Sequence, residues 1–349
     1  MKAAPVLLAL DRRGVSQTLV HTGQHYDANM SEVFFTQLGI PAPDVNLEVG
    51  SGSHAVQTAE IMMRIERELV QRRPDLVLVY GDVNSTMAAA LVCSKLAIRV
   101  GHVEAGLRSF DRAMPEEVNR VVTDQLADLL FTPSKDGDEN LKREGVSAAK
   151  IHCVGNVMID TLIRLLPATE QSNGMPDRYA LVTLHRPSNV DSGERLGEIL
   201  DALREIGKDV EIVFPVHPRT RQRMAEVGLR EDGLQLLGPL PYIEFLALQK
   251  RATVVITDSG GVQEETTFLK VPCLTLRTTT ERPVTVSVGS NVLIGEDLAR
   301  LKSEAARVLS GHAKQGRVPE LWDGRAAERI ADIVMAEASL QSPVSGRQS

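Results

Sequence analysis

The sequence predicts an α/β fold in two doubly wound domains, each with a parallel sheet covered by helices on both faces. Short apolar runs typical of buried strands alternate with longer helical patterns almost throughout the chain. A polar segment, PATEQSNGMPD at 167–177, interrupts this alternation once and has the composition of a linker. The 349 residues are also too many for one ordinary core, so we expect two domains.

The predicted elements follow from the spacing of apolar residues. Before the polar segment, strands are expected at 17–21, 76–80, 100–103, 129–132 and 151–154, and helices at 31–38, 54–72, 85–97, 115–127, 135–144 and 157–166. After it, strands are expected at 180–184, 211–216, 234–237, 254–257 and 273–276, and helices at 194–206, 220–227, 242–250, 261–269, 297–309 and 326–338. These patterns place the domains at 1–166 and 178–325, with a final helical segment at 326–340 and a tail at 341–349.

Composition argues against several classes of protein. The net charge is −7 and aromatic residues make up 3%, which disfavours a nucleic-acid partner. No run of about 18 apolar residues is present, and the N-terminus has no convincing signal-peptide cleavage site, so no membrane association is expected. Cys93, Cys153 and Cys273 lie in apolar runs, as expected for buried thiols in a reducing compartment such as the cytoplasm.

Ligands of doubly wound sheets bind beyond the carboxyl ends of the strands, so the residues after each predicted strand are the first candidates. The run VVITDSGGVQEE at 254–265 joins a strand to a helix through Ser259, Gly260 and Gly261. Glycines and a free helix N-terminus suit a phosphate or diphosphate, and Glu265 lies one turn into the helix, where it could accept ribose hydroxyls. The same letters are also typical of a tight turn that binds nothing.

Three predicted strand or loop ends of the first domain carry carboxylates: Asp82, Glu104 and Glu116. Like charges that gather raise at least one pKa, which is how a carboxyl group becomes a general acid or base. Structural interpretations remain open for each of them. Asp82 could cap a helix, Arg108 could be the structural partner of Glu104, and either Glu116 or its neighbour could simply favour a helix start.

The second domain offers cations at equivalent places. His185 and Arg186 follow its first strand, His217 follows its second, and Arg282 follows a later one. A lone histidine is usually only a satisfied polar residue, but two at strand ends shift the balance toward function. No Cys/His spacing suits a metal, and the first strand is not followed by the glycine pattern of a nicotinamide site. We therefore expect no metal and no cofactor.

Nine segments together resemble the non-hydrolysing UDP-N-acetylglucosamine 2-epimerase family, and they occur in family order over most of the chain. They are TGQHYD (22–27), PDLVLVYGDVNST (74–86), GHVEAGLRS (101–109), MPEEVNR (114–120), VGNVMIDTL (154–162), VTLHRPSNV (182–190), FPVHPRT (214–220), TDSGGVQEE (257–265) and TTTERP (278–283). Each segment is weak alone, but nine in order are a strong signal.

The resemblance implies a glycosyltransferase-B type of fold, in which two Rossmann-like domains face a cleft, in a homodimer whose final helix packs back on the N-terminal domain. It implies inversion of C2 of UDP-N-acetylglucosamine to give UDP-N-acetylmannosamine, without NAD or metal. UDP is eliminated to leave a 2-acetamidoglucal, and it adds back after a proton reaches the other face of C2. Such enzymes usually feed polysaccharide or glycoconjugate synthesis.

Roles carry over from the family by motif. Asp82, Glu104 and Glu116 match the acid/base carboxylates, but the match does not decide which of them removes the C2 proton. His185 matches a catalytic histidine near the diphosphate. The implied substrate contacts are Lys2, Arg108, Arg186, Ser259, Gly260, Gly261, Glu265 and Arg282. Gln24 and His217 match a second, regulatory UDP-sugar site of some members, although Asp27 stands where those members have glutamine.

This chain departs from the family pattern at its start. Members begin with a strand and a G-T-R-P-E-x-x-K turn, and Met1–Pro5 aligns with the end of that turn. The N-terminal domain is therefore predicted to lack its first strand, through either a late start assignment or a truncation. Alternative functions are a 2-epimerase of a UDP-diacetamido-uronic acid, a UDP-sugar glycosyltransferase, a hydrolysing relative and an inactive UDP-sugar binder.

Overall fold

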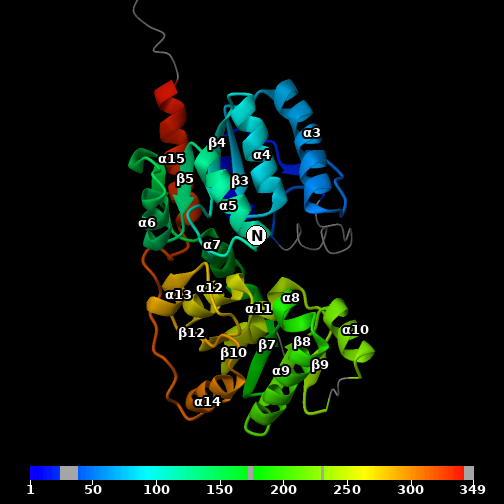
Figure 1. The fold of residues 1–349 in the computed structure, drawn as a ribbon. Coiled ribbons are helices and arrows are strands. Elements are labelled where there is room, and N and C mark those ends of the chain that lie inside the picture. Colours follow the sequence, from blue (N-terminus) through cyan, green and yellow to red (C-terminus); the bar gives the residue numbers. More distant parts are fainter. Residues whose placement is uncertain (24–37, 172–175, 229–231, 342–349) are drawn as a thin grey trace, which may run out of the picture. The chain divides into compact units, whose positions relative to one another are not determined.

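The computed structural model describes residues 1–23, 38–171, 176–228 and 232–341, and the chain forms two compact units (Figure 1). Unit 1 comprises Met1–Thr161 and Glu320–Ser349, and unit 2 comprises Leu162–Pro319. The chain first passes from unit 1 to unit 2 before the polar segment 167–177, part of which lies in the 3-10 helix Leu166–Gln171. No helix within the described residues is long and apolar enough to cross a membrane.

The main sheet of unit 1 is parallel and has the strand order β3-β4-β5-β6. All four strands match predicted runs to within one residue at each end: β3 (Leu76–Tyr80), β4 (Arg99–Val103), β5 (Leu129–Thr132) and β6 (Ile151–Cys153). A separate parallel pair joins β1 (Val20–His21) to β2 (Val45–Asn46). The first is shorter than the predicted strand 17–21, and the second was not predicted because two residues show no periodicity.

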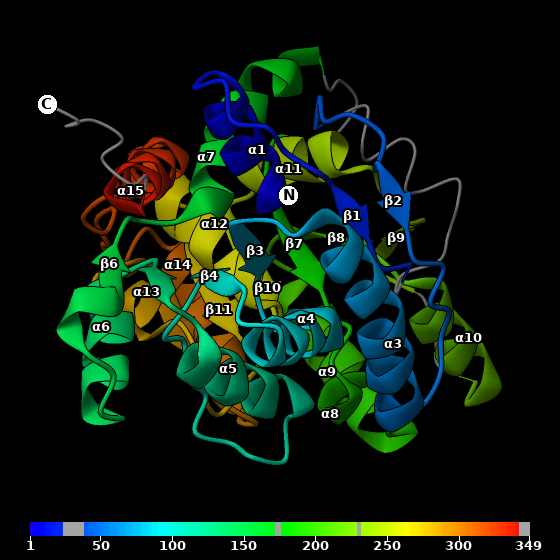
Figure 2. The ribbon, with the colours of Figure 1, turned by 90° about the horizontal axis from the view of Figure 1, so that it is seen from above.

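Each face of this sheet has its own hydrophobic core, because successive side chains of a strand point to opposite faces. Leu76, Leu78 and Tyr80 of β3 pack in a cluster with α1 and α15, whereas Val77 and Val79 pack in a cluster with α3 and α4. Figure 2 shows α3 and α4 side by side. The helices of unit 1 are α1 (Ala3–Asp11), α3 (His54–Arg72), α4 (Asn84–Lys95), α5 (Pro115–Leu126), α6 (Lys135–Arg143) and α15 (Ala326–Gln341), and α7 (Val157–Leu165) spans the boundary with unit 2.

Helix α1 is a correction to the sequence analysis, which aligned residues 1–5 with the end of a turn. Its run AAPVLLALD is rich in good helix formers, and Pro5 lies in the first turn, where proline is tolerated. Ala4, Val6, Ala9 and Leu10 are buried, so packing on the sheet stabilises this short helix. The predicted helix 31–38 lies outside the described residues except for its last position.

Unit 2 has a six-stranded parallel sheet in the order β12-β11-β10-β7-β8-β9. The chain starts in the middle with β7, adds β8 and β9 on one side, and then returns to place β10 on the other side of β7. This is the doubly wound order, and the crevice between β7 and β10 is its switch point, where such sheets bind ligands. The strands are β7 (Tyr179–Thr183), β8 (Glu211–Pro215), β9 (Gln235–Leu237), β10 (Val254–Thr257), β11 (Cys273–Thr275) and β12 (Asn291–Leu293).

Helices cover both faces of this sheet as well. One cluster packs α9 and α14 against Ala180 and Val182 of β7, and the other packs α11 and α12 against Tyr179 and Leu181. Short β12, α8 and α13 were not predicted, since three to five residues carry too little periodicity. The helices are α8 (Pro187–Val190), α9 (Gly193–Ile206), α10 (Pro218–Glu226), α11 (Tyr242–Arg251), α12 (Gly260–Leu269), α13 (Pro283–Ser287) and α14 (Leu298–Leu309).

Candidate active site

Asp82 lies in the turn between β3 and α4. Gly81 precedes it with φ +68° and donates its N–H to the carbonyl of Val103 at 3.0 Å, which ties the turn to the end of β4. The Asp82 carboxylate lies 2.5 Å from the guanidinium of Arg120, and Asn119 donates to the Asp82 carbonyl at 2.9 Å. Both partners come from α5, so α5 fixes the position of this carboxylate.

Glu104 follows β4 in a backbone conformation that is unfavourable for a side-chain residue, with φ +77°. The N–H groups of Glu104 and Ala105 both donate to the carbonyl of Phe131 at the end of β5, which holds this conformation. The side chain is 4% exposed and forms an ion pair with Lys2. Strain of this kind is concentrated at functional sites, where surrounding contacts impose it.

Gly81 is the point where these groups meet. A Cβ atom there would lie 2.6 Å from Nζ of Lys2 and 3.3 Å from Oε2 of Glu104. A side chain at position 81 would displace the Lys2–Glu104 pair from the turn that carries Asp82, and the φ of +68° also favours glycine there. The structure therefore brings two of the three predicted carboxylates, and Lys2, to one end of the sheet.

The third predicted carboxylate, Glu116, lies exposed in the first turn of α5. Its neighbour Glu117 is buried and accepts from the backbone N–H groups of Ser109 and Phe110, both at 2.9 Å. Glu117 also binds Arg120 at 2.8 Å, so Arg120 lies between Glu117 and Asp82. Of the two glutamates, Glu117 is the one with the structural contacts, and Glu116 is the exposed one.

Arg108 lies in a buried charge network. Its guanidinium is 2.7 Å from Asp124 and binds Glu144 at 2.8 and 2.7 Å, so its partners in the structure differ from Glu104, the structural alternative that the sequence left open. Burial lowers the pKa of Arg108, but the opposite effect of Glu144 and Asp124 is larger. The pKa of Arg108 therefore lies above its ordinary value. These contacts hold the loop after β4.

His102 completes the same network beneath the Gly81 turn. Its Nδ1 lies 2.6 Å from Asp124 and its Nε2 lies 2.8 Å from the Gly81 carbonyl. Burial raises the pKa of Asp124, but His102 and Arg108 outweigh burial and hold it below the ordinary value. The ring thus bridges the buried Asp124 carboxylate and the backbone of the Asp82 turn, and so supports that turn.

In unit 2, His185 follows β7 and Asp258 follows β10, on the two sides of the switch point. The Nδ1 atom of His185 lies 2.9 Å from Oδ1 of Asp258. Asp258 is fully buried, whereas the His185 side chain is 55% exposed. The ring therefore lies at the surface beside the switch point, and Asp258 binds its buried edge.

Ser259, Gly260 and Gly261 form the N-terminus of α12, as predicted from sequence. Ser259 is the N-cap and its side chain makes no capping hydrogen bond, which leaves N–H groups of the first turn for a ligand. A Cβ atom at Gly260 would lie 2.4 Å from Nη1 of Arg282, so the guanidinium lies directly against the glycine. A cation beside a helix N-terminus suits an anion, so these residues are a candidate anion site.

Buried glutamates hold the arginines of this anion site. Glu281 binds Arg277 with two bonds of 2.8 and 2.7 Å, and Arg282 at 3.4 Å, and lies 3.8 Å from Arg186. Glu264 lies 2.9 Å from Nε of Arg282. Three guanidinium groups around Glu281 carry an excess of positive charge, which suits a diphosphate.

Glu265 is buried in α12 and accepts from the hydroxyl of Tyr242 at 2.7 Å. Burial raises its pKa to about 7, although the Tyr242 hydrogen bond opposes the rise. Burial and the nearby Glu265 also raise the pKa of Tyr242. At neutral pH this carboxyl group is therefore close to its midpoint, in contrast to an exposed glutamate.

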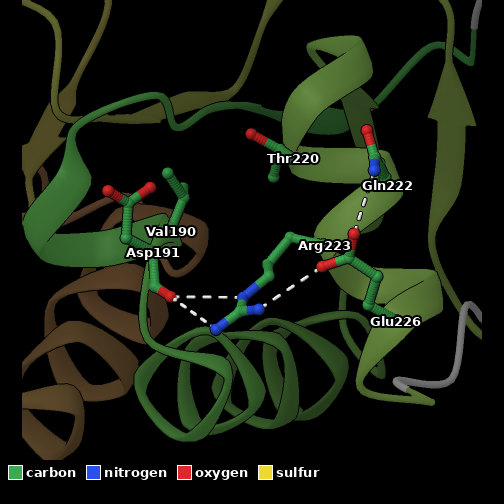
Figure 3. A pocket seen from close by; sticks show the side chains of 6 residues that line it. All are labelled: Val190, Asp191, Thr220, Gln222, Arg223 and Glu226. Carbon is green, nitrogen blue, oxygen red and sulfur yellow. Dashed lines mark hydrogen bonds and ion pairs between the residues drawn. The ribbon is translucent and has the colours of Figure 1, made fainter.

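The predicted regulatory residues do not form a described site. His217 is exposed after β8, and Gln24 and Asp27 lie outside the described residues. A nearby surface pocket is lined by Val190, Asp191, Thr220, Gln222, Arg223 and Glu226 (Figure 3). Arg223 binds the main-chain oxygen of Asp191 at 3.2 and 3.0 Å and the Glu226 carboxylate at 3.3 Å. Arg223 thus has partners within the pocket, and nothing in the lining points to a ligand.

Sequence reasoning missed the buried partners of the site residues. Most lie inside the motifs themselves, so the motifs were the available signal: His102, Glu117, Arg120, Asp258, Glu264 and Glu281. Asp124 and Arg277 lie outside every motif and needed the fold to be found. Among the described residues, no group of three or more His, Cys, Asp or Glu side chains is arranged to hold a metal ion.

Comparisons with known proteins match the chain over nearly its full length. The family model of UDP-N-acetylglucosamine 2-epimerase matches residues 8–335. The Methanocaldococcus jannaschii UDP-N-acetylglucosamine 2-epimerase is 43% identical over 350 residues, 96% of this chain and 95% of the relative. The Pseudomonas aeruginosa UDP-2,3-diacetamido-2,3-dideoxy-D-glucuronate 2-epimerase is 44% identical over 340 residues, 96% of each chain. The crystal structure of the M. jannaschii enzyme in complex with UDP-GlcNAc and UDP has a TM-score of 0.89 at 43% identity, over 96% of each chain.

The two parallel α/β units, together with these relatives, define an isomerase of the nucleotide-sugar class. The chain belongs to the UDP-N-acetylglucosamine 2-epimerase family. The predicted family, enzyme class and fold class are thereby confirmed.

Proposed function

We propose that this chain converts UDP-N-acetylglucosamine to UDP-N-acetylmannosamine by eliminating UDP and adding it back. The observation that carries the proposal is the division of chemistry between the units. Unit 1 presents Asp82 and Glu104 at neighbouring strand ends, and unit 2 presents Arg282 at the N-terminus of α12. Removal of the C2 proton requires a carboxylate base, and departing UDP requires a cationic site rich in N–H groups.

The proposed roles follow this division. Asp82, Glu104 and Glu116 supply the base that takes the C2 proton and the acid that returns one to the opposite face. As the C1–O bond breaks, its electrons go to the departing UDP, which is held by Ser259, Gly260, Gly261, Arg186 and Arg282. His185 lies beside this diphosphate site, and Glu265 binds the ribose.

Two of the residues that the resemblance implies as substrate contacts, Lys2 and Arg108, have partners in unit 1. Lys2 pairs with Glu104 and approaches the sugar together with it. Arg108 is buried between Asp124 and Glu144, so we propose that it supports the loop after β4 rather than reaching the sugar itself.

A second candidate substrate is a UDP-diacetamido-uronic acid, since the P. aeruginosa relative named for that substrate is 44% identical to this chain. Both substrates share the UDP part and the C2 centre, so the proposed residues serve either one. The substituents at C3 and C6 separate them.

A proton NMR time course in D₂O tests the proposal directly. Purified chain is given UDP-N-acetylglucosamine or UDP-2,3-diacetamido-2,3-dideoxy-glucuronate, and the C2 proton is followed together with the product. Exchange of C2 with appearance of the manno product confirms the epimerase. Exchange with the uronic acid alone selects the second substrate, release of free N-acetylmannosamine identifies a hydrolase, and no exchange with either contradicts the proposal.

We also propose a homodimer, in which the exposed face of α3 contacts a second copy. Val56, Met63 and Val70 are spaced by seven residues along this helix and are 59%, 52% and 49% exposed. An antiparallel pairing about Met63 would place Val56 of one copy against Val70 of the other. Light scattering after gel filtration should give a dimer for the wild type and a monomer for Met63→Lys, and Val227→Lys in unit 2 is the control. A monomeric wild type would refute the dimer.

A location in the cytoplasm and a role in supplying polysaccharide synthesis complete the proposal. Cys93, Cys153 and Cys273 are all free thiols, as expected in a reducing compartment. Fractionation of cells that express the tagged chain, and analysis of surface polysaccharide after deletion of its gene, test these two points.

A further inference from the structure

The switch point of unit 2 contains a buried carboxylate to which the sequence analysis assigned no role. Asp258 comes directly after β10, and none of its side chain is exposed. It accepts from four donors: the N–H of His185 at 3.2 Å, the N–H of Arg186 at 3.0 Å, the Asn189 side chain at 3.0 Å and the His185 ring at 2.9 Å. One carboxylate thus fixes both the loop after β7 and the ring that this loop carries.

The charge state of Asp258 follows from these donors. Burial raises the pKa of a carboxyl group, but here His185, Asn189 and the Arg186 N–H outweigh burial, and the pKa of Asp258 lies below its ordinary value. The group is therefore a carboxylate at neutral pH and can only accept hydrogen bonds.

An acceptor at Nδ1 determines the tautomer of the histidine. Nδ1 of His185 must carry a proton to donate to Asp258, so in the neutral ring Nε2 has the free lone pair. A free histidine has no such constraint and exchanges between its two tautomers. In the neutral ring of His185, Nε2 therefore accepts a proton and does not donate one.

We propose that Asp258 is a positioning residue that holds His185 as the Nδ1–H tautomer and makes Nε2 the atom that exchanges a proton with the diphosphate. This inference rests on the proposed role of His185 beside departing UDP. During elimination, protonated Nε2 donates its proton to the UDP oxygen freed as the C1–O bond breaks, and neutral His185 keeps its Nδ1 proton. During addition, Nε2 takes that proton back, and Asp258 stays ionised throughout.

The tautomer can be measured without turnover. Long-range ¹H–¹⁵N spectra of the full-length, ¹⁵N-labelled chain separate the two ring nitrogens, and His185→Gln assigns the signals. We expect the wild type at alkaline pH, where the ring is neutral, to show protonated Nδ1 and unprotonated Nε2. Protonated Nε2 in the neutral wild-type ring would overturn the inference, whatever the activity.

Asp258→Asn tests the coupling to catalysis. We expect mixed tautomers and a kcat lower by about 10- to 100-fold, with a smaller change in KM, because ring orientation matters most as the bond breaks. Asp191→Asn makes the same exchange at an exposed carboxylate after α8 and should change neither the tautomer nor kcat. Wild-type tautomer and kcat in Asp258→Asn would also overturn the inference.

The two proposals can fail separately. If the wild type shows the Nδ1–H tautomer but epimerises no UDP-sugar, the proposed function fails and the positioning by Asp258 stands. If Asp258→Asn does not fold, the wild-type tautomer still decides the inference.

Discussion

The strand-end sites of the two units differ in how their charges are arranged. In unit 2 the acids are buried and the cations are mixed: Glu281 and Asp258 are unexposed and Arg277 and Arg282 are 7% and 9% exposed, whereas Arg186 and His185 are 26% and 55% exposed. In unit 1 the arrangement is mixed, since Asp82 is more exposed than Arg120, but Glu104 is more buried than Lys2. The exposed cations of unit 2 suit the anion site proposed there, and the close acids and cations of unit 1 suit the proton transfer proposed for it.

The largest expected effect comes from the carboxylates of unit 1. Asp82→Asn and Glu104→Gln should each lower kcat/KM for epimerisation by about a thousandfold, because each removes a proton-transfer group. UDP affinity, measured by calorimetry, should stay unchanged, because the anion site belongs to unit 2. Glu139→Gln, an exposed carboxylate of α6, is the matched control. If both variants turn over normally, the acid/base assignment is wrong.

The next effect separates binding from chemistry. Glu281→Gln leaves Arg277, Arg282 and Arg186 without their shared carboxylate, which should lower the free energy of unfolding by about 3 kcal/mol. UDP affinity should fall as well, because the arginines lose their fixed positions. Urea unfolding and calorimetry measure both, with the exposed Glu296→Gln as control. Unchanged stability would show that Glu281 does not organise the site.

A smaller change tests only the contact between the N-terminus of α12 and Arg282. Gly260→Ala adds a Cβ atom where Nη1 of Arg282 lies at 2.4 Å, so the guanidinium must move away from the helix N-terminus. We expect UDP affinity to fall about tenfold, or about 1.4 kcal/mol, with little change in thermal unfolding. Gly238→Ala meets no atom within 4 Å and serves as the control. Equal UDP affinity in both variants would place the anion site elsewhere.

A further prediction concerns the dependence of stability on pH through Glu265. Its folded pKa of about 7 exceeds the ordinary 4.5, so its contribution to stability is fully present below pH 4.5 and is lost as pH rises through 7. Relative to Glu265→Gln, the wild type should therefore lose up to about 3 kcal/mol of unfolding free energy across this range. Parallel stability curves in urea at pH 4.5 to 8 would contradict the raised pKa.

The strands could be predicted well from sequence because strands buried on both faces of a parallel sheet appear as short continuous apolar runs, such as 76–80 and 254–257. It failed for α1 because the family pattern, rather than the helix formers of residues 3–11, guided the interpretation of the N-terminus. Strand ends then located Asp82, Glu104, His185 and Ser259 by topology alone.

The partners of these residues could not be predicted from sequence. Glu116 and Glu117 are adjacent and chemically identical, and only packing buries Glu117 against the loop 109–110. Asp258 lies in the run 254–265 before α12, yet its side chain accepts hydrogen bonds from the loop after β7, 72 and 73 residues earlier in the chain. Such pairings depend on which strands become neighbours, which no local pattern contains.

The left-handed backbone of Glu104 has a consequence for attempts to improve this protein. Glycine adopts φ +77° without strain, so a selection for resistance to heat alone would favour glycine at position 104. The same exchange would remove a carboxylate proposed for catalysis. Directed evolution of this chain therefore has to screen for turnover in every round. At position 104, selection for thermal stability favours glycine, whereas selection for activity favours glutamate.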